Sequence, residues 1–148
     1  MSVKPLVLWP DQRLNEKCLP VKTFGEGKAA IGDDLFDTMK YHKGAGLAAP
    51  QIGRMLRVVC VSLSGGALIM CNPSIISHGK DVEVSREGCL SLPHVFRNVE
   101  RYRVIDVEWF SPSHGYRSQR TFKGLDARII QHEIDHLDGK LINQITNN

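Results

Sequence analysis

Residues 129–139 read IIQHEIDHLDG and place two histidines, His132 and His136, four positions apart. On an α-helix this spacing lets both imidazoles approach one point, as two ligands of a single metal ion would. Glu133 borders the same face, where its carboxylate can act on a water molecule without binding the metal. Such histidines are often ordinary surface or core residues, but burying this many polar groups without a partner costs several kcal/mol. The segment therefore fits the HExxH pattern of two metal ligands and a general base.

A catalytic metal needs a third protein ligand, and the residues after His136 do not supply one. The metzincin pattern HExxHxxGxxH takes its third histidine from a position that is Ile142 here. No glutamate or histidine follows His136, and Asp138 points about 200° around the helix from it. We therefore expect the third ligand to lie upstream. Cys89 is the strongest candidate, because a thiolate binds metals well and Gly88 permits close approach of the backbone.

The whole chain limits the classes of function that need to be considered. Its 148 residues predict one domain, residues 1–148, and its net charge of +3 is spread without a basic run, which argues against nucleic acid as a partner. No stretch approaches the roughly 20 apolar residues of a membrane span, and the N-terminus lacks a signal-peptide pattern. A cytoplasmic protein with reduced thiols is expected. The remaining cysteines are expected to be small buried core residues: Cys18, Cys60 and Cys71.

Hydrophobic spacing predicts the elements that position these residues. Ile31, Leu35, Phe36 and Met39 favour an amphipathic helix over 29–42, ended by the glycines that follow. A second helix, over 125–137, carries the histidines, and its predicted buried face comprises Leu125, Ile129, Ile130, Ile134 and Leu137. Strands are expected over 56–63, 67–76, 95–110 and 116–122. The fold class is therefore α+β, with mainly antiparallel strands packed around a central helix that carries HExxH.

Three segments together resemble the motifs of the peptide deformylase family. They are GAGLAAPQ at 44–51, EGCLS at 87–91 and QHEIDH at 131–136, in the family's order and approximate spacing. The opening segment WPDQRLNEKCLPVKTF at 9–24 is also similar to that of the family, so the resemblance covers nearly the entire chain. It implies a metal site formed by Cys89, His132 and His136.

The resemblance also implies the reaction. Family members remove the N-formyl group from the initiator methionine of nascent polypeptides and release formate. A metal-bound water attacks the formyl carbon, and Glu133 serves as general base and then as general acid. The resemblance assigns stabilisation of the oxyanion to the side-chain amide of Gln51 and the backbone N–H of Leu90. The usual metal is Fe²⁺, with Zn²⁺, Ni²⁺ or Co²⁺ as possible substitutes.

Substrate contacts are implied for residues of the glycine-rich loop and of the cysteine motif. Gly46 matches the residue that contacts the substrate main chain, and Ala45 replaces a position that is often larger in the family. The full set of expected substrate-binding residues is Gly44, Ala45, Gly46, Gly88 and Arg97. A solvated arginine is an equal alternative for Arg97, and an ordinary loop glutamine is the alternative for Gln51.

The expected partners are N-formylmethionyl peptides, and the protein itself is expected to be a monomer. Many family members continue into a longer C-terminal helix implicated in ribosome association, whereas only twelve residues follow His136 here. A short form is therefore expected, with at most transient contact at the ribosome exit. Two rival functions fit parts of the pattern: a zinc endopeptidase that uses the same HExxH, and a non-catalytic metal-binding or ribosome-associated module. The absent downstream ligand disfavours the first, and the presence of Glu133 and Gln51 disfavours the second.

Overall fold

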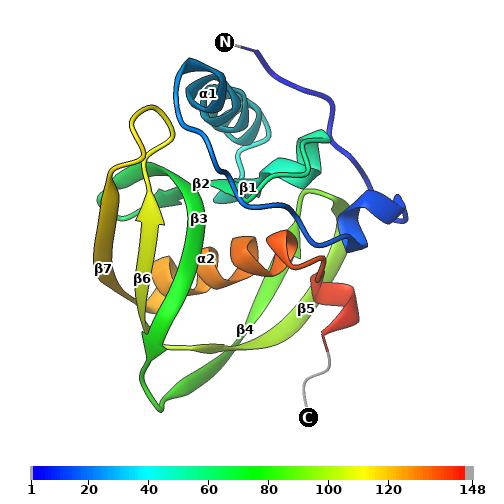
Figure 1. The fold of residues 1–148 in the computed structure, drawn as a ribbon. Helices are drawn as coiled ribbons and strands as arrows, with labels where there is room; N and C mark the ends of the chain where they lie inside the picture. The colour runs from blue at the N-terminus through cyan, green and yellow to red at the C-terminus, as the bar shows by residue number, and fades with distance from the viewer. Residues whose placement is uncertain (1, 146–148) are drawn as a thin grey trace.

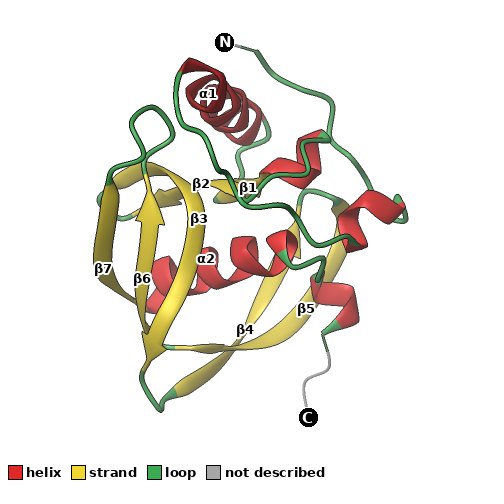
Figure 2. Ribbon diagram, in the orientation of Figure 1, coloured by secondary structure: helices red, strands yellow, loops and turns green. Residues whose placement is uncertain are grey.

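The computed structural model describes residues 2–145, in which two antiparallel sheets enclose helix α2 (Figures 1 and 2). The larger sheet has the order β1-β2-β3-β6-β7 and the smaller is the hairpin β4-β5. Helix α2 contacts strands of both sheets, and helix α1 packs against β1, β2 and β3. The predicted α+β class with mainly antiparallel strands around a central helix is confirmed.

The helix that carries both histidines is α2, Gly124–Leu137, close to the predicted 125–137. Ile130, Ile134 and Leu137 face the core as predicted, and Gly139, with φ of 75°, follows the end of the helix. The prediction for Leu125 is wrong, because its side chain is 71% exposed. The helix begins at Gly124, so Leu125 lies in its first turn, where it lines a cavity instead of the core.

Helix α1, Glu26–Tyr41, corresponds to the helix predicted over 29–42. Ile31, Leu35 and Met39 form its buried side, because residues three to four positions apart share one face. No strand was predicted directly beyond this helix. Instead Gly46–Ala48 form the short strand β1, which pairs with β2 and brings the glycine-rich loop alongside α2.

The predicted strands are present with shifted ends. Strands β2, Val58–Leu63, and β3, Gly66–His78, form a hairpin where 56–63 and 67–76 were predicted. The long run 95–110 is split between β5, Leu92–Tyr102, and β6, Val104–Phe110, and β7 spans Arg117–Lys123. Strand β4, Val82–Cys89, was not predicted. Short 3-10 helices complete the described chain, at Gln12–Asn15, Ala49–Ile52 and Ile142–Gln144.

The core fills the space between the larger sheet and the two helices, and it contains three of the four cysteines. Cys18, Cys60 and Cys71 are buried, as predicted for small apolar residues. Burial raises the pKa of the Cys60 thiol to about 12, and those of Cys18 and Cys71 to about 11. These thiols are therefore protonated at neutral pH, and Cys89, which is only partly buried, is the cysteine available for other chemistry.

Candidate metal centre and catalytic cleft

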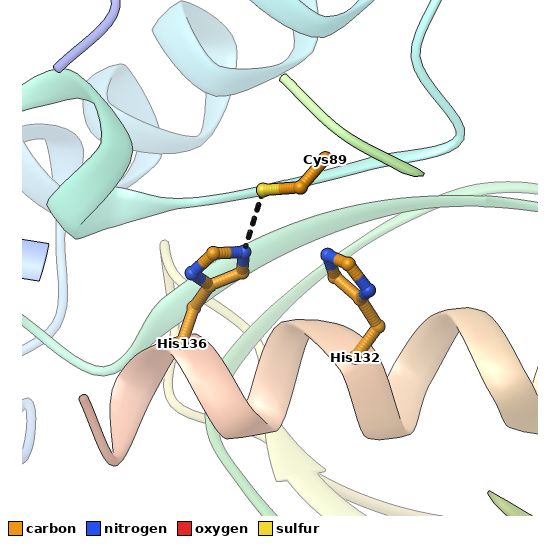
Figure 3. A group of neighbouring side chains, drawn as sticks. All are labelled: Cys89, His132 and His136. Atoms are coloured by element: carbon orange, nitrogen blue, oxygen red, sulfur yellow. Dashed lines mark hydrogen bonds between the residues drawn. The ribbon is translucent and has the colours of Figure 1, made fainter. Parts of the chain in front are cut away.

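Cys89, His132 and His136 converge on one point beside α2 (Figure 3). The histidines lie one helical turn apart with ring centroids separated by 5.0 Å, and β4 brings Cys89 to them at its last residue. The Cys89 Sγ atom lies 3.3 Å from Nε2 of His136. One donor atom from each of the three residues lies within 4.8 Å of the others.

This donor set fits a divalent transition metal. Donors on one tetrahedral ion, bound through sulfur at about 2.3 Å and nitrogen at about 2.1 Å, are separated by roughly 3.3–3.6 Å. The Cys89–His136 separation lies in this range, and all three donors lie within 4.8 Å of one another. Thiolate and imidazole are ligands that Fe²⁺, Co²⁺, Ni²⁺ and Zn²⁺ accept. Asp138 takes no part, because it is paired with Arg57 at 3.0 Å.

A buried ionic network fixes the orientation of His132. Glu87 Oε1 lies 2.9 Å from Nδ1 of His132, so that Nε2 is the nitrogen turned towards the centre. Two arginines hold the Glu87 carboxylate: Arg101 donates at 2.9 and 3.0 Å, and Arg128 donates at 2.6 Å. Arg101 is also paired with Asp135. Such outer partners orient metal-binding histidines and strengthen their binding.

The environment of the centre shifts the pKa values of its two histidines in opposite directions. Burial lowers the pKa of His132, but its hydrogen bonds with Cys89 and Glu87 outweigh burial and raise that pKa to about 10. Burial and the charge of His132 lower the pKa of His136 well below its ordinary value, so His136 is neutral and its Nε2 can act as a ligand.

Glu133 lines the same cleft, on the side of α2 that faces β1. Its Oε1 atom is buried and has no hydrogen-bond partner within residues 2–145. Burial raises the pKa of this carboxyl to about 7, although the charges of His132 and Arg101 oppose the rise. An unpartnered carboxylate with such a pKa is suited to exchange a proton with a group in the cleft.

Gln51 brings the glycine-rich segment to the centre. Its Oε1 accepts a hydrogen bond from the Ala48 N–H at 2.9 Å, so its Nε2 is the end turned towards the cysteine motif. Nε2 lies 3.7 Å from Cys89 Sγ and 3.0 Å from the hydroxyl of Ser91. Gln51 is only 2% exposed, and such fixed contacts are not those of an ordinary loop glutamine.

The cleft is a cavity of about 1110 Å³ that lies beside the three donors. Leu125 and Ile129 of α2 supply an apolar part of its wall. Leu90 also lines the cavity. So do most of the residues expected to bind substrate, namely Gly44, Ala45, Gly46 and Gly88. Arg97 does not line this cavity. It lies on the exposed side of β5 beside a smaller hollow, and its guanidinium donates to the Phe96 carbonyl at 2.8 Å.

Sequence reasoning missed several residues that shape the site. Glu87 and Ser91 stand inside the EGCLS segment, but no role was predicted for either of them. Arg101 and Arg128 lie in unrelated elements, and only the fold brings them to Glu87. The one available signal was the position of Glu87, two residues before the candidate ligand Cys89. A carboxylate buried at such a site needs cationic partners.

Comparison with known proteins finds similarity over nearly the full chain. The family model described as polypeptide deformylase matches residues 3–148. A peptide deformylase of Pseudothermotoga lettingae is 40% identical over 139 residues, which cover 94% of this chain and 80% of the relative. The crystal structure of the Thermotoga maritima peptide deformylase superposes with a TM-score of 0.94 at 32% identity, and covers 99% of this chain and all of that one.

A second solved structure is described as bound to a peptide. The class I type b peptide deformylase of Acinetobacter baumannii, described as Met-Ala-Ser bound, has a TM-score of 0.92 at 29% identity, over 98% of this chain and all of that one. Within residues 2–145, no helix is long and apolar enough to cross a membrane. The matched family model, the level of identity and the shared fold show that this chain belongs to the polypeptide deformylase family.

Proposed function

We propose that this chain is a metal-dependent hydrolase that removes the N-formyl group from the initiator methionine of nascent polypeptides and releases formate. One observation carries the proposal: Cys89, His132 and His136 converge within 4.8 Å beside the cavity that Glu133 lines, in a chain of the polypeptide deformylase family. We further propose that residues 1–148 act as one catalytic domain and as a monomer.

Cys89, His132 and His136 would hold the metal, with Fe²⁺ as the native ion and Zn²⁺, Ni²⁺ or Co²⁺ as substitutes. When bound, the metal supplies Lewis-acid activation of water and of the formyl carbonyl. Fe²⁺ binds such donors more weakly than Zn²⁺, so iron loading depends on which metal is available. Glu87 contacts Nδ1 of His132, which would leave Nε2 as the nitrogen that binds the metal.

Glu133 moves the proton. Its carboxylate takes a proton from the attacking water and delivers it to the amine nitrogen as the bond between formyl carbon and nitrogen breaks. The position supports this role, because the buried Oε1 has no other partner in the described chain and the carboxylate borders both the donors and the cavity. The same carboxylate therefore serves both halves of the reaction.

Gln51 and Leu90 stabilise the oxyanion that develops on the formyl oxygen. The Nε2 of Gln51 reaches to 3.7 Å from Cys89 Sγ, and Leu90 follows the cysteine directly, so both donors border the same point. A preorganised donor of this kind contributes about 3–4 kcal/mol to lowering the barrier.

The peptide lies along the cleft. Gly44, Ala45, Gly46 and Gly88 line the cavity and would face the substrate backbone, which can add to β1 in the manner of an extra strand. Leu125 and Ile129 offer apolar surface to a methionine side chain. The Acinetobacter relative described as bound to Met-Ala-Ser supports a short peptide that begins with methionine as the ligand of this cleft. Arg97, beside its smaller hollow, would meet only residues farther along the peptide.

The substrates would be N-formylmethionyl peptides in the cytoplasm, encountered transiently where chains leave the ribosome. The decisive assay is release of formate from formyl-Met-Ala by protein purified without oxygen and loaded with iron. We expect turnover with this peptide and none with acetyl-Met-Ala, and we expect Glu133→Ala to bind metal normally while losing 10²- to 10⁴-fold in rate. Absence of formate release by the fully loaded wild type would refute the proposed function.

A further inference from the structure

A chain of hydrogen bonds connects Gln51 to the N-terminal arm, which we define as residues 3–9 (Figure 1, dark blue). Gln51 Nε2 lies 3.0 Å from Ser91 Oγ, and Ser91 Oγ lies 2.7 Å from the carbonyl oxygen of Val7. A carbonyl can only accept, so the single hydroxyl proton of Ser91 goes to Val7. Ser91 must then accept from Gln51, and the direction of the whole chain is determined.

Backbone hydrogen bonds tie the same segments together. The Val7 N–H donates to the Gln51 carbonyl at 2.7 Å, and the Trp9 N–H donates to the Ser91 carbonyl at 3.0 Å. Two residues of the arm therefore bridge the glycine-rich segment and the cysteine motif, which lie 40 positions apart in the sequence. Ser91 is 0% exposed, so water cannot replace these partners without opening the structure.

The contacts leave the Gln51 amide with little freedom. Its oxygen is held by the Ala48 N–H, and one of its two Nε2 protons is held by Ser91. The second Nε2 proton remains for the centre, where Cys89 Sγ lies 3.7 Å from the nitrogen. Loss of the Ser91 acceptor would leave the amide held only through its oxygen by the Ala48 N–H, so the direction of the second Nε2 proton would be less firmly fixed.

We propose that Ser91 is a positioning residue, which acts through Gln51, and that the N-terminal arm holds Ser91 in place by accepting its proton at Val7. The inference rests on the proposed function, because it assigns Gln51 to the oxyanion. Preorganisation of a donor matters for the rate since a shift of about 1 Å in a reacting group costs up to 10²-fold.

The test compares Ser91→Ala with the wild type in the iron-loaded form. We expect kcat on formyl-Met-Ala to fall about ten- to a hundredfold with KM nearly unchanged, because the donor acts on the transition state. In a Gln51→Ala background, Ser91→Ala should cause no further loss of kcat, since the two act as a unit. Ser91→Thr, which retains the hydroxyl, should restore most of kcat.

Thr38→Val is the matched control. Thr38 is fully buried and its Oγ1 accepts from the Lys4 N–H at 2.8 Å, so this variant weakens the same arm away from Gln51. It should lose stability and keep the wild-type kcat. Full kcat in Ser91→Ala, or an equal fold-loss with and without Gln51, would overturn the inference while leaving the proposed function intact.

Wild-type protein gives a measurement that needs neither turnover nor a folded variant. In the metal-free protein the Nε2 protons of Gln51 should exchange with deuterium much more slowly than those of Gln119, a glutamine exposed on β7. Exchange at equal rates would contradict the proposal that Ser91 and the arm hold the Gln51 amide, whether or not the wild type releases formate. Failure of the wild-type assay combined with slow exchange would instead remove the proposed function and leave the held amide as a structural feature.

Discussion

Gly46 and Glu133 face each other across the cleft so closely that a Cβ at position 46 would lie 2.5 Å from Glu133 Oε2. The same Cβ would lie 2.9 Å from Cδ and Cγ of the glutamate, so rotation of the carboxylate alone would not relieve the contact. Glycine at this position therefore leaves room for the side chain that we propose as the proton carrier. The two residues come from separate motifs, one in β1 and one in α2.

Gly46→Ala should displace Glu133 and lower kcat by about ten- to a hundredfold, because misplacement of a reacting group by about 1 Å has costs of this size. Metal content should be unchanged, since the three atoms nearest to the added Cβ all belong to Glu133 and none to a donor residue. Steady-state formate release and metal analysis of the same preparation measure both. Gly27→Ala is the control: it lies in α1, nothing is within 4 Å of its added Cβ, and kcat should be that of the wild type. Wild-type kcat in Gly46→Ala would contradict the assigned position of Glu133.

The stability of the metal-free protein should depend on acid through Glu87. Burial raises the pKa of Glu87, but hydrogen bonds from His132 and Arg101 outweigh it and lower the pKa from 4.5 to about 2. A carboxylate with a lowered pKa stabilises the fold above its unfolded pKa, and that contribution is lost as the pH falls towards the folded pKa. The Glu87 contribution should therefore be complete above about pH 5 and should decline from pH 4.5 towards pH 2.

Glu87→Gln measures this contribution. The difference in unfolding free energy between wild type and variant, from urea titrations, should shrink as the pH falls below 4.5. Glu83→Gln is the control, because Glu83 is exposed and its contact with Arg103 is a surface pair at 4.0 Å. A difference for Glu87→Gln that grows below pH 4.5 would contradict the assigned charge state.

Thiol labelling should separate Cys89 from the other cysteines. Burial raises the pKa of Cys18, Cys60 and Cys71, so at pH 8 these thiols should resist iodoacetamide. Metal-free protein should gain one label, located at Cys89 by peptide mass spectrometry, and prior loading with zinc should prevent the reaction. Urea-unfolded protein, in which four thiols react, supplies the reference. Equal labelling of Cys89 with and without zinc would contradict its role as a ligand.

The sequence predicted the elements with strong periodicity. The helix over 125–137 is α2, because buried residues recur every three to four positions, and the hairpin β2–β3 is clear from two apolar runs separated by a turn. Leu125 was placed wrongly because periodicity cannot tell a core face from the wall of a cavity. Both are apolar, and only the surrounding strands decide which one a side chain meets.

The sequence did not predict β4, although it delivers Cys89. Its residues VEVSREGC include several polar ones and give no clear apolar run. The hairpin β4–β5 has one side exposed to solvent, where even Val84 is 56% exposed and Phe96 is 50% exposed. The third donor could be proposed only by eliminating alternatives and by family resemblance. Its approach to His136 depends on pairing between strands β4 and β5, a long-range feature that local spacing does not encode.

The hydrogen bonds that connect Gln51, Ser91 and Val7 could not be predicted from the sequence either. Serine at position 91 has no periodic or compositional signal, and its role depends on three segments that meet only in the folded chain. Hydrogen-bond partners of this kind are set by topology, whereas the amphipathic pattern of α2 is set by neighbours along one helix.

The account depends on one ion held jointly by Cys89, His132 and His136, and X-ray absorption of the zinc-loaded protein tests this directly. We expect one zinc per chain, with one sulfur at about 2.3 Å and two imidazole nitrogens at about 2.0–2.1 Å. Cys89→Ser should remove the sulfur contribution and leave the imidazole signal. A wild-type spectrum without sulfur, or with sulfur that persists in Cys89→Ser, would contradict the proposed metal centre.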